Sequence, residues 1–222
     1  MIKKTIYPKI VNETNTLIEH FGLQWQPKEY GLLTDWIQEP TLKIDDYAEA
    51  TLAKLEKNLF KYIDSWYEED LKMKFLSFIF FLAEITEDQK IDTFFEKIIK
   101  TEAREVQINV VVDCMISSVL GLAAPKKPYF FMQEFKKSKG DSQDPEGQML
   151  AAMIAAQYLN KNDKPLYGAY VIGERWYFTV LDGVNYAKTA AFSLTKPAEL
   201  RQVILSLRKL KSIILDDLFE KP

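Results

Sequence analysis

Three charged residues interrupt segments that are otherwise rich in apolar side chains. Asp113 lies within the apolar run of residues 106–117, and Glu134 and Lys136 lie near the end of the run of residues 128–137. Because successive side chains of a strand point to opposite faces, Glu134 and Lys136 are expected to share one face. A carboxylate in the position of Asp113 requires a partner or a metal ion, since burying an unpaired charge is costly. The pattern predicts a charged cleft at the ends of two neighbouring strands.

The residue types allow two interpretations of this set. In the first, Asp113, Glu134 and the backbone carbonyl of Phe135 hold Mg²⁺ or Mn²⁺, which would stabilise charge on a scissile phosphate and lower the pKa of an attacking water. Lys136 would then lie beside that water and hold the nucleophile or the phosphate by its charge. In the second, Asp113 and Lys136 form a structural ion pair between neighbouring strands, without a metal.

The remaining inventory argues against several other chemistries. His20 is the only histidine and Cys114 the only cysteine, which disfavours a Ser-His-Asp or Cys-His nucleophile, a structural zinc site and an internal disulfide. No GxxxxGK[ST] or GxGxxG motif occurs, so folds that bind nucleotide cofactors are not expected. Any catalysis must therefore use carboxylates, lysines and amides.

The overall composition is that of an ordinary globular chain, with 222 residues, 47% hydrophobic and 27% charged. The formal net charge of −3 is uneven, since residues 101–222 hold 16 Lys+Arg against 14 Asp+Glu, and this half is the better candidate for binding a polyanion. The N-terminus lacks the apolar core of a signal peptide, and the longest apolar stretch is far below the roughly 20 residues of a membrane helix. We therefore expect a cytoplasmic protein with no membrane partner.

The elements that must position the charged residues follow from the spacing of apolar residues. The expected helices are residues 8–21, 45–66, 70–83, 145–160 and 197–217, and the expected strands are residues 93–103, 106–117, 128–136, 166–172, 175–181 and 184–194. The helix of residues 70–83 is apolar nearly all round, which predicts that it is buried between layers. Asp144 and Pro145 supply an N-cap and a first helical residue for the helix that follows the third strand.

This order of elements predicts an α+β or α/β chain. A helical N-terminal part, residues 1–92, is expected to pack on a core formed by residues 93–222, in which helices flank a mixed central sheet. The strands of residues 106–117 and 128–136 are expected to be central neighbours. The helices of residues 145–160 and 70–83 should each cover a face of the sheet.

The same pattern resembles the PD-(D/E)XK nuclease superfamily, whose restriction-endonuclease-like fold has an αβββαβ core. The matching residues are Asp113 in a hydrophobic strand, a turn of sequence GLAAPKKP, and Glu134-Phe135-Lys136 twenty-one positions after the aspartate. A helix bearing Gln148 follows, where many members of the superfamily carry a motif glutamine. The proline that often precedes the first acidic residue is absent, because Val112 occupies that position.

The resemblance implies a nuclease that depends on Mg²⁺ or Mn²⁺ and hydrolyses phosphodiester bonds in nucleic acid, with DNA as the first candidate. It implies catalytic roles for Asp113, Glu134, Lys136 and Gln148, the last orienting a water or Lys136. It also implies an upstream helical carboxylate, for which Glu69 is the first candidate and Glu84 the second. The alternative is a catalytically inactive relative that binds nucleic acid or a protein partner. Whether the substrate is DNA or RNA, and whether the protein forms a homodimer, stay open.

Further residues offer nucleic-acid contacts, although solvated surface and core packing are the commoner roles of such residues. The basic candidates near the third strand are Lys126, Lys127, Lys137 and Lys139, and those on the last helix are Arg201, Arg208, Lys209 and Lys211. The aromatic candidates for stacking on bases are Trp176, Tyr177 and Tyr186.

Overall fold

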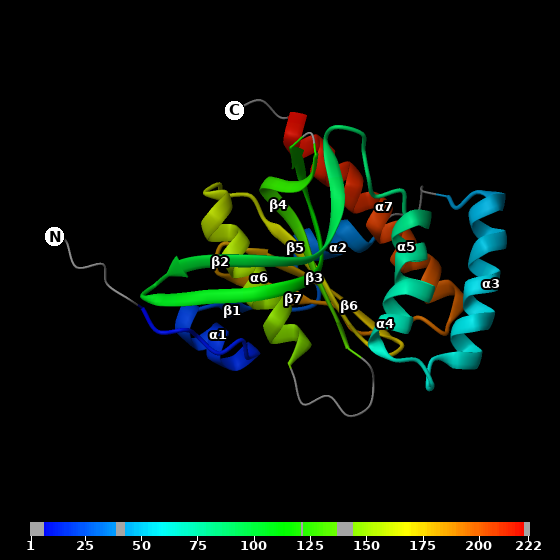
Figure 1. The fold of residues 1–222 in the computed structure, drawn as a ribbon, viewed down its shortest axis with the longest axis horizontal. Helices are drawn as coiled ribbons and strands as arrows, with labels where there is room; N and C mark the ends of the chain where they lie inside the picture. Colours follow the sequence, from blue (N-terminus) through cyan, green and yellow to red (C-terminus); the bar gives the residue numbers. More distant parts are fainter. Residues whose placement is uncertain (1–6, 39–42, 121, 137–143, 220–222) are drawn as a thin grey trace.

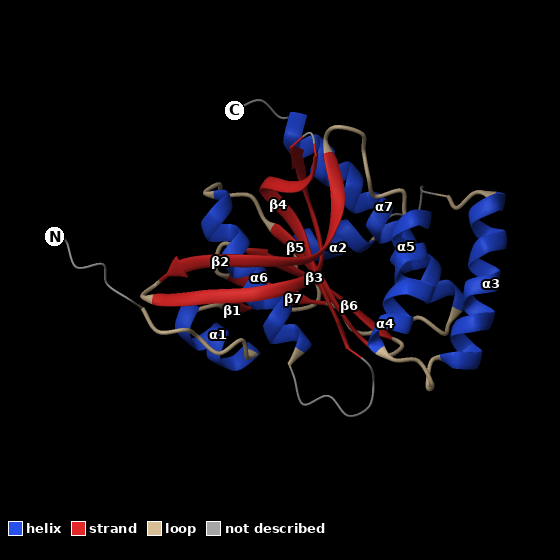
Figure 2. Cartoon of the chain, viewed as in Figure 1, coloured by secondary structure: helices blue, strands red, loops and turns tan. Residues whose placement is uncertain are grey.

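Strands form where β-branched and aromatic residues cluster, and they assemble into one mixed sheet. The computed structural model of the protein describes residues 7–38, 43–120, 122–136 and 144–219. In the described residues, seven strands of the eight-stranded sheet follow the order β1-β7-β6-β5-β4-β3-β2, and the eighth, β8, pairs with β6. Their bounds are β1 Gln24–Trp25, β2 Ile91–Ala103, β3 Val106–Leu120, β4 Leu122–Lys136, β5 Leu166–Ile172, β6 Arg175–Asp182, β7 Asn185–Lys188 and β8 Phe192–Ser193. The predicted mixed sheet flanked by helices is confirmed (Figure 2).

The centre of the sheet contains the two strands that carry the charged residues. β2, β3 and β4 are joined as antiparallel neighbours, whereas β4 and β5 run parallel. The predicted pairing of the strands around residues 106–117 and 128–136 is therefore confirmed. In Figure 1 the long hairpin of β2 and β3 extends toward the side of the molecule that carries α1 (Thr14–Phe21).

One face of the sheet is covered by α6 (Pro145–Asn160), as predicted. The Asp144 side chain accepts a hydrogen bond from the Gly147 N–H and so caps the helix. All residues of α6 from Met149 to Ala156 are buried, since the helix lies between the sheet and α1. This helix therefore packs on the face of β4 that carries Met132 and, by alternation, Glu134.

The close packing of α6 on the N-terminal segment gives a prediction about Gly147. A Cβ built on this residue would lie 2.5 Å from Asn12 O and 2.7 Å from Thr14 N, both of which are backbone atoms. Gly147→Ala is expected to destabilise the protein by about 1–3 kcal/mol, because the backbone must shift to admit the methyl group. Urea denaturation measures this change. Gly31→Ala is the control, since nothing lies within 4 Å of a Cβ there, and an equal loss in both variants would contradict the packing argument.

The opposite face is covered by helices from both ends of the chain. They are α2 (Gly31–Ile37), α3 (Asp46–Tyr62), the continuous segment of α4 (Glu68–Leu71), η1 (Lys72–Leu76) and α5 (Ser77–Leu82), and α7 (Pro197–Phe219). The indole N–H of Trp36, on α2, donates to the backbone carbonyl of Ser206, on α7. Figure 1 shows α3, α4, α5 and α7 together on one side of the molecule.

The segment of residues 68–82 differs from its prediction in two ways. Phe75, Leu76 and Ile79 are buried, but Met73 is 71% exposed and Phe81 65% exposed, so the segment is not buried between layers. Its middle turn, η1, is π-helical, with the Ser77 N–H donating to the Lys72 carbonyl five residues earlier. The apolar composition misled the prediction because one side of this helix faces solvent.

The N-terminal part also differs from its prediction. α1 begins only at Thr14, because the residues before it are extended along β3, with the Ile10 N–H donating to Gln107 O and the Gln107 N–H donating to Pro8 O. β1 pairs in parallel with β7, so residues 24–25 belong to the central sheet. The N-terminal part is thus built into the sheet as well as packed upon it.

Candidate functional site

Asp113 and Glu134 lie where β3 and β4 separate. The register of these strands runs from Leu120–Leu122 to Cys114–Gln133, after which residues 134–136 continue their pairing with β5. At the point of separation, Asp113 Oδ2 accepts a hydrogen bond of 2.8 Å from the Phe135 N–H. A side-chain carboxylate thus takes the place of a backbone acceptor, and this opens a fork between the two strands.

Glu134 and Lys136, which were predicted to share one face of β4, are both buried. Glu134 is 4% exposed and Lys136 8% exposed, and Glu134 Oε1 lies 3.0 Å from Lys136 Nζ. Burial, together with the charge of Asp113, raises the pKa of Glu134 to about 8, although Lys136 opposes this shift. Burial alone would lower the pKa of Lys136, but Glu134, Asp113 and Glu68 hold it above its ordinary value. Lys136 therefore stays positively charged at neutral pH.

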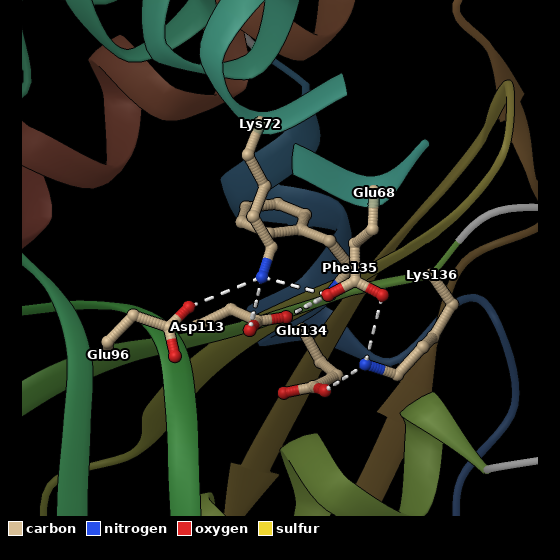
Figure 3. A network of polar contacts seen from close by, with 7 residues as sticks. All are labelled: Glu68, Lys72, Glu96, Asp113, Glu134, Phe135 and Lys136. Carbon is tan, nitrogen blue, oxygen red and sulfur yellow. Dashed lines mark hydrogen bonds and ion pairs between the residues drawn. The ribbon is translucent and has the colours of Figure 1, made fainter. Parts of the chain in front are cut away.

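The helical segment above the fork contributes a carboxylate and a second ammonium group (Figure 3). Glu68 Oε2 lies 3.4 Å from Lys136 Nζ, and Glu68 Oε1 lies 2.9 Å from Lys72 Nζ. Lys72 Nζ also lies 2.7 Å from Asp113 Oδ1 and 3.3 Å from Glu96 Oε1. We call these six residues, Glu68, Lys72, Glu96, Asp113, Glu134 and Lys136, the fork cluster. Three of its members were not singled out in the sequence.

The fork cluster has more carboxylates than ammonium groups. Its four carboxylates and two lysines leave two uncompensated negative charges when all six groups are ionised, and one when Glu134 keeps its proton. Such a set of hard oxygen donors suits a divalent cation. Within the described residues, however, no group of three or more His, Cys, Asp or Glu side chains is arranged to hold a metal ion. A cation would thus have two protein carboxylates, those of Asp113 and Glu134, with backbone and water as further ligands.

The structure places the other predicted site residues outside the fork cluster. Glu69 is exposed, and its neighbour Glu68 points to the sheet instead, since it shares a helix face with Lys72 four residues later. Glu84 forms an ion pair with Arg208. Gln148 is half-buried in the second turn of α6 and is not part of the network drawn in Figure 3. The orientation of the Phe135 carbonyl toward a metal stays a prediction.

The predicted structural ion pair has different partners from those expected. Asp113 binds Lys72 and the Phe135 N–H, while Lys136 binds Glu134 and Glu68. The i,i+4 spacing of Glu68 and Lys72 was the available signal for these partners. Glu96 carried no such signal in the sequence. It lies opposite Asp113, between the register pairs Phe95–Cys114 and Lys97–Val112, and its φ is 52°.

Most of the candidate nucleic-acid contacts have structural roles. Trp176 and Tyr186 are fully buried, which excludes them from stacking on bases in this structure, and Tyr177 stacks on Tyr170. On α7, Arg201 binds Glu49 and Glu56, and Lys211 binds Glu87. Lys126 and Lys127 are exposed on β4 and remain candidates, whereas Lys137 and Lys139 lie outside the described residues.

The raised pKa of Glu134 predicts a pH-dependent stability. Between about pH 4.5 and 8 the folded state retains a proton that the unfolded state releases, so stability falls as the pH rises through this window. Glu134→Gln removes this titration, and its free energy of unfolding relative to wild type is expected to rise by at least about 1.4 kcal/mol from pH 5 to pH 8. Denaturant unfolding at several pH values measures it.

Glu49→Gln is the matched control for this experiment. Hydrogen bonds from Arg201 lower the pKa of Glu49, so the stability contributed by this carboxylate is lost only as the pH falls below its ordinary value. The difference between Glu49→Gln and wild type should therefore be constant from pH 5 to pH 8. A constant difference for Glu134→Gln as well would show that Glu134 titrates normally.

The fold and the fork cluster define the class: an α+β protein with a buried, charged site where two central strands of a mixed sheet separate. No protein-family model matches the chain, and no curated protein is significantly similar to it. None of the helices in the described ranges has both the length and the apolar character that crossing a bilayer requires. The chemistry of the fork cluster is therefore the basis for assigning a function.

Proposed function

We propose that the protein is a nuclease that depends on Mg²⁺ or Mn²⁺ and hydrolyses phosphodiester bonds at the fork cluster. The observation that carries this proposal is the convergence of buried Asp113 and Glu134 from neighbouring strands beside the Lys136 ammonium. The element order α5-β2-β3-β4-α6-β5, with β4 parallel to β5, supports a restriction-endonuclease-like core of the predicted αβββαβ type.

Asp113 and Glu134, with the Phe135 carbonyl, are the residues that would hold the cation. Glu68 is close enough to Lys136 to hold the ammonium group of that lysine in place. When bound, the cation would stabilise charge on the scissile phosphate and lower the pKa of a nearby water. Glu134 must first lose the proton that its raised pKa favours at neutral pH, because only the carboxylate is a good ligand. Metal affinity should therefore increase with pH up to about 8.

Lys136 supplies the positive charge of the proposed reaction. Because Glu134, Asp113 and Glu68 keep the pKa of Lys136 above its ordinary value, Lys136 is a cation that can hold the phosphate or the attacking water by hydrogen bonds. This role differs from that of a lysine that loses its proton through burial.

The test is cleavage of end-labelled single-stranded DNA, duplex DNA, branched DNA and RNA with Mg²⁺, with Mn²⁺ and with EDTA. The proposal predicts cleavage of at least one substrate with either metal and none with EDTA. Absence of cleavage on every substrate with both metals, by protein that is folded, would overturn it.

The second candidate is a catalytically inactive binding protein, and Lys72 is the observation that favours it. Its ammonium already contacts Asp113, Glu68 and Glu96, so it neutralises part of the fork cluster without a metal. This candidate predicts that folded wild-type protein cleaves nothing. Any binding to nucleic acid would then survive Glu134→Ala and weaken with added salt.

A further inference from the structure

A pocket of about 610 Å³ lies between the end of α3 and the turn that joins β5 to β6. One wall is formed by Phe60, Ile63 and Asp64, at and just after the C-terminal end of α3, and the other by Ile172, Glu174 and Arg175, at the β5–β6 turn. Each wall contains a residue that is close to a member of the cluster, along the chain or in the register of the sheet. Three residues separate Asp64 from Glu68.

On the second wall, Ile172 is the register partner of Lys136, and the Gly173 N–H donates to the Lys136 carbonyl at 2.8 Å. The second wall of the pocket therefore lies beside the backbone of the lysine that is proposed to hold the phosphate. A ligand in the pocket and a phosphodiester at the fork cluster can belong to one molecule, since both sites lie at the carboxyl ends of the parallel strands β4 and β5.

The groups around this pocket differ in how far they are already engaged. Glu174 accepts a hydrogen bond of 2.6 Å from Thr195 Oγ1, which satisfies it within the protein. Among the described residues, the carboxylate of Asp64 and the guanidinium of Arg175 have no side-chain hydrogen bond or ion pair with one another or with any neighbour. Phe60 is 79% exposed. The pocket thus offers a ring face, a hydrogen-bond acceptor and a cation.

We propose that this pocket binds one unpaired nucleobase of a single-stranded nucleic acid whose neighbouring phosphodiester lies at the fork cluster. This proposal rests on the proposed function and extends it to the class of substrate. The base stacks on Phe60, its exocyclic amino group donates to Asp64, and Arg175 binds the adjoining phosphate. The volume of about 610 Å³ is that of a small-ligand site and admits one nucleotide more readily than paired strands.

Two preferences follow from these contacts. A base within a duplex is stacked and paired, and taking it out costs free energy, so single strands should bind more tightly than duplexes. Cytosine, with its amino group, should bind more tightly than thymine, which has a carbonyl oxygen in the place of that amino group.

Fluorescence anisotropy with labelled oligo-dC, oligo-dT and a mixed-sequence duplex tests the pocket in EDTA, where no cleavage occurs. Phe60→Ala is expected to weaken oligo-dC binding about tenfold, through the loss of stacking. Asp64→Ala is expected to abolish the preference for oligo-dC over oligo-dT. Arg175→Gln is expected to weaken binding of both and to reduce the salt dependence by about one counterion.

Phe81→Ala and Lys57→Gln are the matched controls, because both residues are exposed but do not line the pocket. Binding by Phe60→Ala and Arg175→Gln equal to that of these controls would overturn the pocket proposal, as would absence of oligonucleotide binding by wild type. Pocket-dependent binding without cleavage by wild type would sustain the pocket and overturn the nuclease proposal. Cleavage by wild type that is unaffected by Phe60→Ala would sustain the nuclease proposal and overturn the pocket proposal.

Discussion

Asp113→Asn, Glu134→Gln and Lys136→Met are each expected to reduce metal-dependent cleavage by at least about a hundredfold. The first two substitutions keep the size of the side chain but remove a negative oxygen that the cation requires. The third keeps most of the aliphatic length of Lys136 and removes the charge that faces Glu134 at 3.0 Å. Initial rates on the best wild-type substrate, with thermal unfolding of each variant, measure the effect.

The adjacent carboxylates of α4 provide an internal control for this experiment. Glu68→Gln should lower the cleavage rate, because Glu68 contacts both Lys136 and Lys72, whereas Glu69→Gln should leave it unchanged, because Glu69 is exposed. An Asp113→Asn variant that is folded and as active as wild type would contradict the assignment of the site. So would equal losses in the Glu68 and Glu69 variants.

Lys72→Met is expected to lower the free energy of unfolding by about 2 kcal/mol. This loss is smaller than that expected for breaking a fully buried ion pair, because the Lys72 side chain is 18% exposed. The loss arises because Asp113 and Glu68 keep their charges while their nearest cation disappears. The double variant Lys72→Met/Asp113→Asn should cost less than the sum of the two single variants by at least about 1 kcal/mol, since both partners are removed together. Denaturant unfolding of the four proteins completes the cycle.

The Lys72→Met variant also tests whether the fork cluster binds a metal ion. If Asp113 and Glu134 hold a divalent cation, Mn²⁺ should raise the melting temperature of Lys72→Met more than that of wild type, because the ammonium no longer competes for Asp113. Lys74→Met is the control, since Lys74 is 58% exposed and pairs with Asp70 away from the cluster. A melting temperature that Mn²⁺ leaves unchanged in both wild type and Lys72→Met would favour the inactive binding protein.

The sequence was sufficient to predict the strands that carry Asp113, Glu134 and Lys136. Their alternation and apolar runs reflect local geometry, which a single segment contains, and the Asp144 cap of α6 is likewise a local signal. The i,i+4 spacing of Glu68 and Lys72 was not sufficient to select Glu68, because the acidic run of residues 68–70 offers three carboxylates and Asp70 has the same spacing to Lys74. Only the tertiary packing of a four-residue helix decides which of them faces the sheet.

The errors elsewhere have the same physical origin. Composition alone placed the segment of residues 70–83 between two layers, yet Met73 and Phe81 face solvent because no further element covers them among the described residues. Pro8 and Ile10 follow a helix-like pattern but are extended, since their backbone groups bond to Gln107 on β3. The spacing of residues within one segment does not predict long-range hydrogen-bond partners of this kind.

The π-helical turn at Lys72–Leu76 sets the rotational phase between the two halves of its helix. One extra residue in a turn rotates everything upstream by about 100° relative to an uninterrupted α-helix, because each residue advances the helix by that angle. Downstream, Phe75 and Ile79 stay anchored in the core, so upstream the rotation determines where Glu68 and Lys72 point. Deleting Met73 would therefore preserve the hydrophobic anchor while turning both charged side chains away from Asp113. The positions of Glu68 and Lys72 in the fork cluster thus depend on this π-helical turn.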